Sequence, residues 1–352
     1  MRRLFAISTL IIMALLTLGI FPVTPAVAAP ARQDDQVAQG KYIAAIAGCV
    51  GCHTPIDKTT FTPVTGKEFS GGEPFDLGPL GIVYSKNLTS DMKTGLGDWT
   101  DEEIKTAITT GVSKDGLHLF PVMPYHFFNN MADKDLDTLV AFLRTIPPIE
   151  NQVERRQILP PEALPQLERK SGIVAPDPKD TAARGRYLMT SVLVCNDCHT
   201  PVNPETQQPI LEKYLAGGQP FEGPWGIVYG GNITPDQKTG IGSWTDADIE
   251  RLLRTGVRPD GRVTVVMPFF IYQNLNADDM KAVTYYLKND VKAVDGVVPA
   301  ANLKEGFERY VEIALPQPAV DPLLLGVVGG VLFLLVGGGV FLFMRNRASA
   351  TK

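Results

Sequence analysis

The chain has 352 residues, a length typical of about two domains, and a formal net charge of −5. Hydrophobic residues make up 44% of it and charged residues 20%, which is typical of a globular protein with additional apolar segments. The mild acidity argues against a nucleic-acid-binding protein, because that class needs a basic face.

The N-terminus has the pattern of a secretory signal peptide over residues 1–29. Two arginines precede an apolar run from Leu4 to Phe21, and small residues at 26–28 offer a cleavage site. We therefore expect an exported protein whose mature chain starts near Ala29. An uncleaved membrane anchor is the alternative interpretation of the same segment.

The exported part contains an internal duplication. The sequence GKYIAAIAGCVGCHTP at 40–55 matches GRYLMTSVLVCNDCHTP at 185–201, and the similarity continues to residues 144 and 288. A fixed internal period indicates one structural unit built twice. The sequence of each repeat predicts a few helices, separated by loops rich in glycine and proline. The predicted helices are 36–47, 100–110 and 136–143 in the first repeat, and 182–194, 245–255 and 276–288 in the second.

All four cysteines lie in two copies of one pentapeptide, CVGCH at 49–53 and CNDCH at 195–199. C-x-x-C-H is the attachment signature of c-type haem. Two thiols with this spacing form thioethers with the two vinyl groups of one porphyrin, and the adjacent imidazole supplies the proximal iron ligand. We therefore predict two covalently bound haem c groups, attached through Cys49, Cys52, Cys195 and Cys198, with His53 and His199 on the irons.

Three other uses of a C-x-x-C motif are less consistent with the sequence. A redox dithiol needs a thioredoxin-like βαβ setting, which is absent. A zinc site needs a fourth ligand, and neither repeat has a second C-x-x-C or an H-x-H. A pair of disulfides is possible in an oxidising compartment, but it leaves the two matched histidines without a role.

The sixth iron ligand is predicted from a matched pair of methionines. Met123 in VMPY aligns with Met267 in VMPF, and each is followed by a rigid proline. No other methionine of the exported part has a counterpart in the other repeat. A methionine before proline is also an ordinary core filler. His118 or His126 is the alternative ligand of the first iron. Methionine–histidine ligation favours a six-coordinate iron that passes single electrons.

A second apolar run lies at the C-terminus. Leu323 to Met344 has 22 residues and no charge, enough to span a hydrocarbon core of about 30 Å at about 1.5 Å per residue. The basic tail after it favours the cytoplasmic side. We therefore expect a single-pass cell-membrane protein with its haem domains on the periplasmic side. Gly326 and Gly330 form a GxxxG motif, which favours docking with another transmembrane helix.

The repeated motifs resemble the class I cytochrome c domains of multihaem membrane cytochromes. The resemblance covers about 40–147 and 185–288 and is closest to the cytochrome c subunits of membrane-bound alcohol, gluconate and aldehyde dehydrogenases. It implies small α-helical haem domains with His53/Met123 and His199/Met267 as axial pairs. It also implies that the helix with Gly40 and Tyr42 crosses the terminal helix near Phe142, and that Gly185 and Tyr187 meet Tyr286. Subunits of that family typically carry three haem domains, whereas this chain has two.

The predicted fold class is mostly α, with two tandem class I cytochrome c domains and one C-terminal transmembrane helix. The expected parts of the chain are a signal peptide (1–29), a first cytochrome c domain (34–147), a linker (148–180), a second cytochrome c domain (181–293), a second linker (294–322), a transmembrane helix (323–344) and a cytoplasmic tail (345–352).

The favoured function is single-electron transfer, without catalysis of its own, in a respiratory or photosynthetic chain. The donor would be a dehydrogenase, a quinol-oxidising complex or a carrier, and the acceptor a further carrier or oxidase. A dihaem cytochrome c peroxidase is the enzymatic alternative, and it requires one iron with an open position. A purely structural role in a membrane complex is the third hypothesis.

Overall fold

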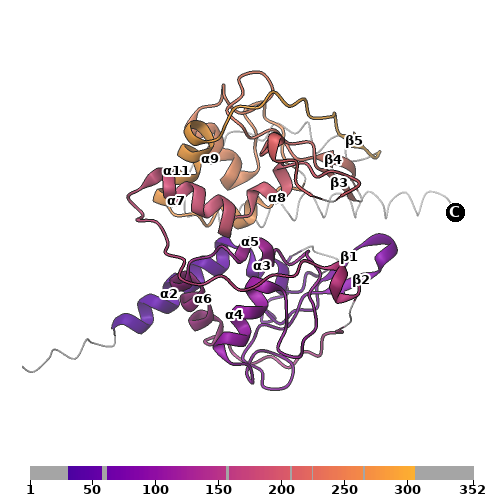
Figure 1. Cartoon of the computed structure of the whole chain (residues 1–352), viewed down its shortest axis with the longest axis vertical. Coiled ribbons are helices and arrows are strands. Elements are labelled where there is room, and N and C mark those ends of the chain that lie inside the picture. The colour runs from indigo at the N-terminus through magenta and orange to yellow at the C-terminus, as the bar shows by residue number, and fades with distance from the viewer. Residues whose placement is uncertain are drawn as a thin grey trace, which may run out of the picture. The chain divides into compact units, whose positions relative to one another are not determined.

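The computed structural model describes residues 31–57, 62–155, 158–206, 208–223, 225–264 and 266–305. The regular elements of this part of the chain are mainly helices, with a few short strands, and loops connect them (Figure 1). Its residues from Gln36 onward belong to one compact unit. The repeats divide that unit into a first half, which ends at residue 147, and a second half, which begins at residue 181.

The first half has the expected helices and one unexpected strand pair. Strands β1 and β2 are antiparallel, with Pro74 opposite Tyr84 and Asp76 opposite Ile82. The helices are α2 (Ala31–Ile46), α3 (Cys49–His53), α4 (Asp101–Thr110), α5 (Tyr125–Phe128) and α6 (Asp133–Leu143); the strands are β1 (Pro74–Asp76) and β2 (Ile82–Tyr84); the 3₁₀ turns, including one in the linker, are η1 (Gly78–Leu80) and η2 (Pro161–Ala163).

The second half repeats this order of elements. Strands β3 and β4 pair as β1 and β2 do, and the short strand β5 adds to the free edge of β4. Its helices are α7 (Thr181–Tyr187), the π-helix η3 (Leu188–Val192), α8 (Cys195–His199), the 3₁₀ turn η4 (Leu211–Lys213), α9 (Asp246–Thr255), α10 (Phe269–Tyr272), α11 (Ala277–Tyr285) and the π-helix η5 (Tyr286–Asp290); its strands are β3 (Pro220–Gly223), β4 (Gly226–Tyr229) and β5 (Asn302–Leu303).

The predicted starts of α4 and α9 are confirmed, because Thr100 and Thr245 are the N-caps of these helices. The Thr100 hydroxyl accepts from the amide of Glu103, whose carboxylate accepts in turn from the amide of Thr100. Thr245 and Asp248 form the same capping box at α9. These bonds satisfy amide groups that a helix start otherwise leaves unpaired.

Two glycines let the first and last helices of each half cross in close contact. A Cβ on Gly40 would lie 1.8 Å from the carbonyl oxygen of Thr138 and 2.8 Å from Cβ of Phe142. A Cβ on Gly185 would lie 2.0 Å from the carbonyl oxygen of Ala282, and α7 and α11 accordingly pack side by side (Figure 1). The predicted crossings are confirmed, and only a residue without a Cβ permits them.

The resemblance placed Tyr42 and Tyr187 in the helix crossings of their own halves, but the hydroxyl of each bonds to the other half. The Tyr42 hydroxyl donates to Oδ2 of Asp279 at 2.7 Å, and the Tyr187 hydroxyl donates to Oδ2 of Asp135 at 2.6 Å. Each bond joins one half of the chain to the other. The buried Arg184 also donates to both carboxylate oxygens of Asp279, at 2.7 and 2.9 Å.

Each π-helix coincides with a one-residue insertion in the second repeat. Seven positions separate Tyr42 from Cys49 and eight separate Tyr187 from Cys195, and η3 lies in the longer segment. The second π-helix, η5, lies where the second repeat is again one residue longer: six positions separate Leu143 from Ile149 and seven separate Leu287 from Val294. A π-turn accommodates an extra residue without ending the helix, so the flanking contacts keep their register.

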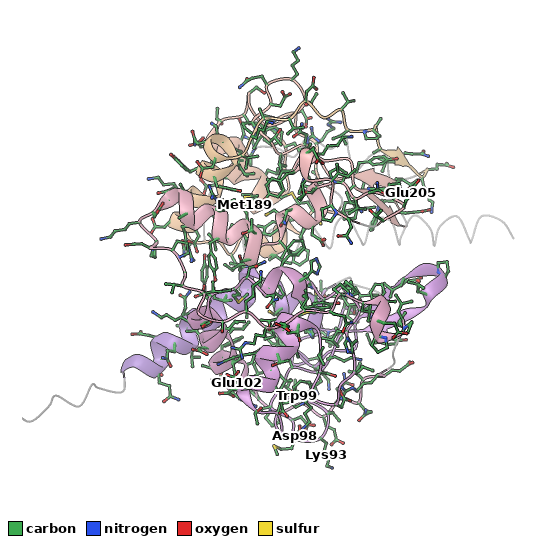
Figure 2. All side chains as sticks on the ribbon, in the orientation of Figure 1. Lys93, Asp98, Trp99, Glu102, Met189 and Glu205 are labelled. Atoms are coloured by element: carbon green, nitrogen blue, oxygen red, sulfur yellow. The ribbon has the colours of Figure 1, made fainter. Side chains whose placement is uncertain are left out.

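The side chains separate into a packed interior and a charged exterior. Figure 2 labels Asp98, Glu102 and Lys93 at the exposed periphery, whereas Met189 is fully buried in the core. The predicted surface linker contributes to the interior as well, because Val153 and Leu164 are buried. The segment after residue 147 therefore packs as part of the fold.

The prediction of a transmembrane helix and a single-pass membrane location is contradicted. None of the helices in the described ranges is both long enough and apolar enough to cross a membrane. The longest of them, α2, has 16 residues and carries several charges, so it reaches about 24 Å against a core of about 30 Å. The segment 323–344, with Gly326 and Gly330, lies outside the described residues, as does the predicted signal peptide.

At the helix crossings, an alanine in place of Gly40 or Gly185 should destabilise the protein, because the steric clash of its Cβ costs more than its higher helix propensity contributes. Replacing Gly40 or Gly185 with alanine should favour the helix by about 1 kcal/mol, while overpacking costs about 3 kcal/mol. We expect the free energy of unfolding to fall by about 2 kcal/mol, measured by urea denaturation. Gly231→Ala is the matched control, because a Cβ there has no neighbour within 4 Å. Equal stability of all three variants would contradict the prediction.

Candidate functional site

The two cysteine motifs each form a single helical turn, α3 and α8. In a helix, residues three and four apart lie on one face, so both thiols and the histidine of each motif point to the same side. The residues before the motifs, Gly48 and Val194, are left-handed, with φ of 79° and 48°. The chain therefore turns sharply into each motif.

The cysteines are free thiols with little tendency to ionise. No disulfide joins them, which argues against the disulfide interpretation. Burial raises the pKa of the Cys49 and Cys195 thiols to about 12, whereas a reactive redox thiolate requires a lowered pKa. Within the described ranges, no three His, Cys, Asp or Glu side chains are grouped to hold a metal ion. The zinc and redox interpretations therefore lose support.

A backbone carbonyl orients each motif histidine. Nδ1 of His53 lies 2.7 Å from the carbonyl oxygen of Lys86, and Nδ1 of His199 lies 2.7 Å from that of Gly231. A carbonyl only accepts, so Nδ1 carries the proton and Nε2 keeps its lone pair. Burial also lowers the pKa of both histidines. Each ring is thus a neutral imidazole held in the orientation that iron ligation requires.

A buried asparagine fixes the loop that supplies the first carbonyl. Asn87 donates to the hydroxyl of Thr94 and to the carbonyl of Ile149, at 3.0 and 2.8 Å, and accepts from the amide of Thr89 at 3.0 Å. Its neighbour Lys86 provides the acceptor for the histidine. Asn87 therefore holds the loop through bonds to Thr89 and Thr94 of the loop itself and through a bond to Ile149 of the linker; we call this set of bonds the asparagine clamp.

Asn232 makes the equivalent three bonds in the second half. It donates to Thr239 and to the carbonyl of Val294, and accepts from the amide of Thr234. Neither asparagine was among the predicted site residues. The repeated Asn-Leu/Ile-Thr block was a sequence signal for them, because buried amides are retained where they satisfy backbone groups.

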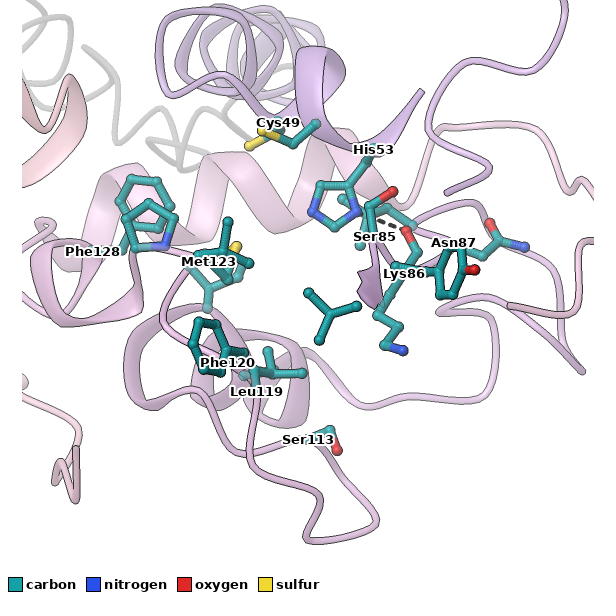
Figure 3. Close-up of a pocket in the computed structure, with 18 of the residues that line it drawn as sticks. Cys49, His53, Ser85, Lys86, Asn87, Ser113, Leu119, Phe120, Met123 and Phe128 are labelled. Atoms are coloured by element: carbon teal, nitrogen blue, oxygen red, sulfur yellow. Dashed lines mark hydrogen bonds between the residues drawn. The ribbon is translucent and has the colours of Figure 1, made fainter. Parts of the chain in front are cut away.

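A cavity of about 540 Å³ opens beside the first motif. Its wall includes Cys49, Cys52, His53 and Met123, together with mainly apolar side chains. Figure 3 shows His53 and Met123 at this cavity, with Phe120 and Leu119 on the same side as Met123. The volume lies within the range of about 300–1,000 Å³ that is usual for cofactor sites.

The two matched methionines occupy equivalent turns. The amide of Tyr125 donates to the carbonyl of Met123, and the amide of Phe269 donates to that of Met267, both at 2.8 Å. Both methionines are partly buried against the core. Of the alternative ligands, His118 lines the cavity, whereas His126 packs its ring on Phe127 at 4.2 Å.

Aromatic and basic residues form part of the cavity wall. Tyr84, Trp99 and Lys114 line it, and the Lys114 ammonium lies 5.9 Å from the centre of the Trp99 ring. In the second half, Arg258 lies 6.0 Å from the ring of Trp244. Each tryptophan therefore carries a cation on its face.

The residues present fit a covalently bound haem. Two protonated thiols and a neutral imidazole with a free Nε2 border an apolar cavity that also exposes a thioether sulfur. These are the groups that thioether attachment and axial ligation require. In the second half, the motif, the oriented histidine and the methionine turn are arranged in the same way.

Comparison with protein families gives a match to the cytochrome c family over residues 37–147. A domain of that family implies covalently bound haem c. The match ends where α6 and its C-terminal turn end.

Three relatives show the range of similar proteins. The cytochrome c subunit of gluconate 2-dehydrogenase from Pantoea cypripedii is 32% identical, over 74% of this chain and 62% of that subunit. The fructose dehydrogenase cytochrome subunit from Gluconobacter japonicus is 30% identical, over 83% of this chain and 60% of that subunit. A dihaem cytochrome c-type protein from Cereibacter sphaeroides is 29% identical, over 72% of this chain and 85% of that protein. The predicted resemblance to dehydrogenase cytochrome c subunits is confirmed, and the chain spans about three fifths of the first two relatives.

The asparagine clamps predict a specific loss of stability. Replacing Asn87 or Asn232 with alanine leaves the buried amide of Thr89 or Thr234 without its acceptor and removes one donor from the carbonyl of Ile149 or Val294. We expect the free energy of unfolding to fall by about 3 kcal/mol, measured by urea denaturation. Asn289→Ala is the control, because that exposed side chain bonds only within its own helix. A loss no greater than the control's would show that water replaces the clamp.

Proposed function

We propose that the chain is a dihaem c-type cytochrome that transfers single electrons, on the premise that residues 37–147 match the cytochrome c family. The first haem is attached through Cys49 and Cys52, with His53 and Met123 as axial ligands. The second is attached through Cys195 and Cys198, with His199 and Met267 as axial ligands.

One observation carries this proposal: an oriented, neutral histidine lies beside two thiols at a cavity that also contains Met123. When bound, haem c supplies an iron centre that gains and loses one electron. The hydrogen bond to the Lys86 carbonyl holds the His53 ring and its proton at Nδ1. Because the clamp at Asn87 fixes that carbonyl, the ligand keeps its place when the charge of the site changes.

The cavity wall favours electron transfer over substrate chemistry. Apolar side chains such as Leu96, Ile104 and Leu139 keep water from the site. Methionine at the sixth position would leave the iron without an open position for a substrate. A thioether ligand and an apolar surrounding both raise the reduction potential.

The second site is proposed on the repetition of these features. The motif turn, the carbonyl at 2.7 Å from Nδ1 and the turn at Met267 all recur. Similarity over most of a dihaem protein supports a count of two. The domain limits 34–147 and 181–293 follow from the same repetition.

The proposed partners are redox proteins. The gluconate and fructose dehydrogenase relatives are named as cytochrome subunits of those enzymes, which supports an electron-transfer subunit that receives electrons from a dehydrogenase. A quinol-oxidising complex or a soluble carrier is a further possible donor. The downstream acceptor is another carrier or an oxidase.

A dihaem peroxidase remains the alternative that the experiments must separate. It requires one iron with an open position and a polar residue nearby to cleave the O–O bond. His118, on the cavity wall, is the residue that would distinguish the two, either as a ligand in place of Met123 or as a group beside an open iron.

The first prediction for this function concerns haem number. Replacing Cys49 and Cys52 together with serine should remove one of two haem equivalents, and replacing Cys195 and Cys198 should remove the other. The measurement is the pyridine haemochrome absorbance per protein, with haem-stained denaturing gels. The two double variants serve as controls for each other, and a wild-type count of one haem would refute the dihaem proposal.

The second prediction concerns the axial methionines. In the oxidised protein, Met123→Leu or Met267→Leu should each abolish half of the long-wavelength sulfur-to-iron band and produce a high-spin EPR signal. His118→Gln should leave both unchanged, because methionine rather than histidine is the proposed ligand. Loss of a low-spin signal in His118→Gln, with the band intact in Met123→Leu, would favour the peroxidase.

A further inference from the structure

The two halves meet through a reciprocal pair of hydrogen bonds. Tyr42 donates to Asp279 at 2.7 Å, and Tyr187 donates to Asp135 at 2.6 Å. The two tyrosines hold matching positions in the repeats, as do the two aspartates. Each half therefore contributes the same tyrosine and the same aspartate to the contact. Such a reciprocal surface is typical of a two-fold dimer.

Each tyrosine hydroxyl also accepts a bond at the start of a helix in the other half. The amide of Ala132 donates to Tyr187 at 3.0 Å, and the amide of Asn276 donates to Tyr42 at 3.3 Å. The carboxylates that accept these hydroxyl hydrogen bonds, Asp135 and Asp279, are 5% and 3% exposed. Buried carboxylates need such donors, so these bonds define one docked arrangement of the halves.

The first haem-attachment motif rests on the second half. A Cβ on Gly48 would lie 2.7 Å from Cδ1 of Ile271, and a Cβ on Gly51 would lie 3.1 Å from Cε2 of Phe270. Ile271 and Phe270 belong to α10, which follows Met267 after one proline. The attachment turn of the first site therefore touches the helix beside the axial methionine of the second.

The second haem-attachment motif has an equivalent contact with the first half, and equivalent positions of the two repeats take part in it. Helix α5, which follows Met123, packs against η3 before the second motif. Its His126 matches Phe270, and Asp197 of the second motif matches Gly51. Helix α5 of the first half therefore contacts the segment before the second motif, as α10 of the second half contacts the first motif.

The cavity of the first site reaches the second motif. Besides Cys49 and Cys52, its wall includes Leu193, Asp197 and Cys198. A thiol of the second attachment motif thus borders the space beside the first. The two attachment motifs therefore share one wall of this cavity.

We propose that the reciprocal tyrosine–aspartate contact is an internal docking surface that holds the two haem sites side by side, so that electrons pass directly between them within one chain. This inference rests on the proposed function, because it requires haem at both motifs. In each exchange one site loses one electron and the other gains it, while no bond forms or breaks. Tyr42 and Tyr187 are positioning residues and take no part in the redox step.

The test compares the full-length haem-loaded protein with its Tyr42→Phe/Tyr187→Phe variant. In the unchanged protein we expect an excitonic couplet in the Soret circular dichroism and a spin–spin interaction between the oxidised haems in EPR. The double variant should lose both, and flash-reduced electrons should equilibrate more slowly between the sites. Tyr285→Phe is the matched control, because that ring is exposed.

Every outcome bears on the inference. An unchanged protein with two haems but no couplet and no spin interaction would overturn it and leave the proposed function standing. A couplet that survives in the folded double variant would overturn the role of the tyrosines. A chain with fewer than two haems would overturn both the proposed function and the inference. If the double variant does not fold, the unchanged protein's couplet and spin interaction still decide whether the sites adjoin.

Discussion

Each site depends on a hydrogen bond of 2.7 Å from a histidine Nδ1 to a backbone carbonyl. That bond is useful only if the carbonyl is held in place, and a loop rich in glycine does not hold it alone. The buried Asn87 and Asn232 tie the loops to residues more than sixty positions further along. The chain after each helical core therefore belongs to the site, which explains why the first linker is partly buried.

A second group of buried polar contacts acts at longer range. Arg184 and Asp279 form a buried ion pair, and Tyr42 adds a donor to the same carboxylate. In the first half, Gln39 stands where the second has Arg184, so Asp135 has the Tyr187 hydroxyl as its side-chain donor. Removing one partner of a buried charge costs more than the pair contributes. The two tyrosine–aspartate contacts are thus equivalent in geometry, but we expect them to contribute differently to stability.

The sequence allowed the helices and the site to be predicted to different extents. Helix α4 was predictable because its capping box is local, and the crossing at Gly40 because a resemblance supplied the partner helix. The axial candidates were found by matching one repeat against the other, which needs no structure. The strands β1 to β4 were not predicted, because each has three or four residues and too few positions for an alternating pattern to register.

The contacts between the halves could not be predicted at all. Tyr42 and Asp279 are 237 positions apart, and nothing in either repeat alone distinguishes a tyrosine that packs within its own half from one that reaches across. The transmembrane prediction is contradicted because none of the helices in the described ranges could cross a membrane, and the segment 323–344 on which it was based lies outside those ranges.

The π-helices η3 and η5 lie at positions where the second repeat is one residue longer than the first. Added residues are usually accommodated in loops, but here the loops hold the histidine carbonyls and the methionine turns. A wider turn in a helix takes up one residue and returns the chain to its former direction. The helices of this protein therefore take up two of the length differences between its repeats. The loops take up others, because 70 positions separate His53 from Met123 and 68 separate His199 from Met267.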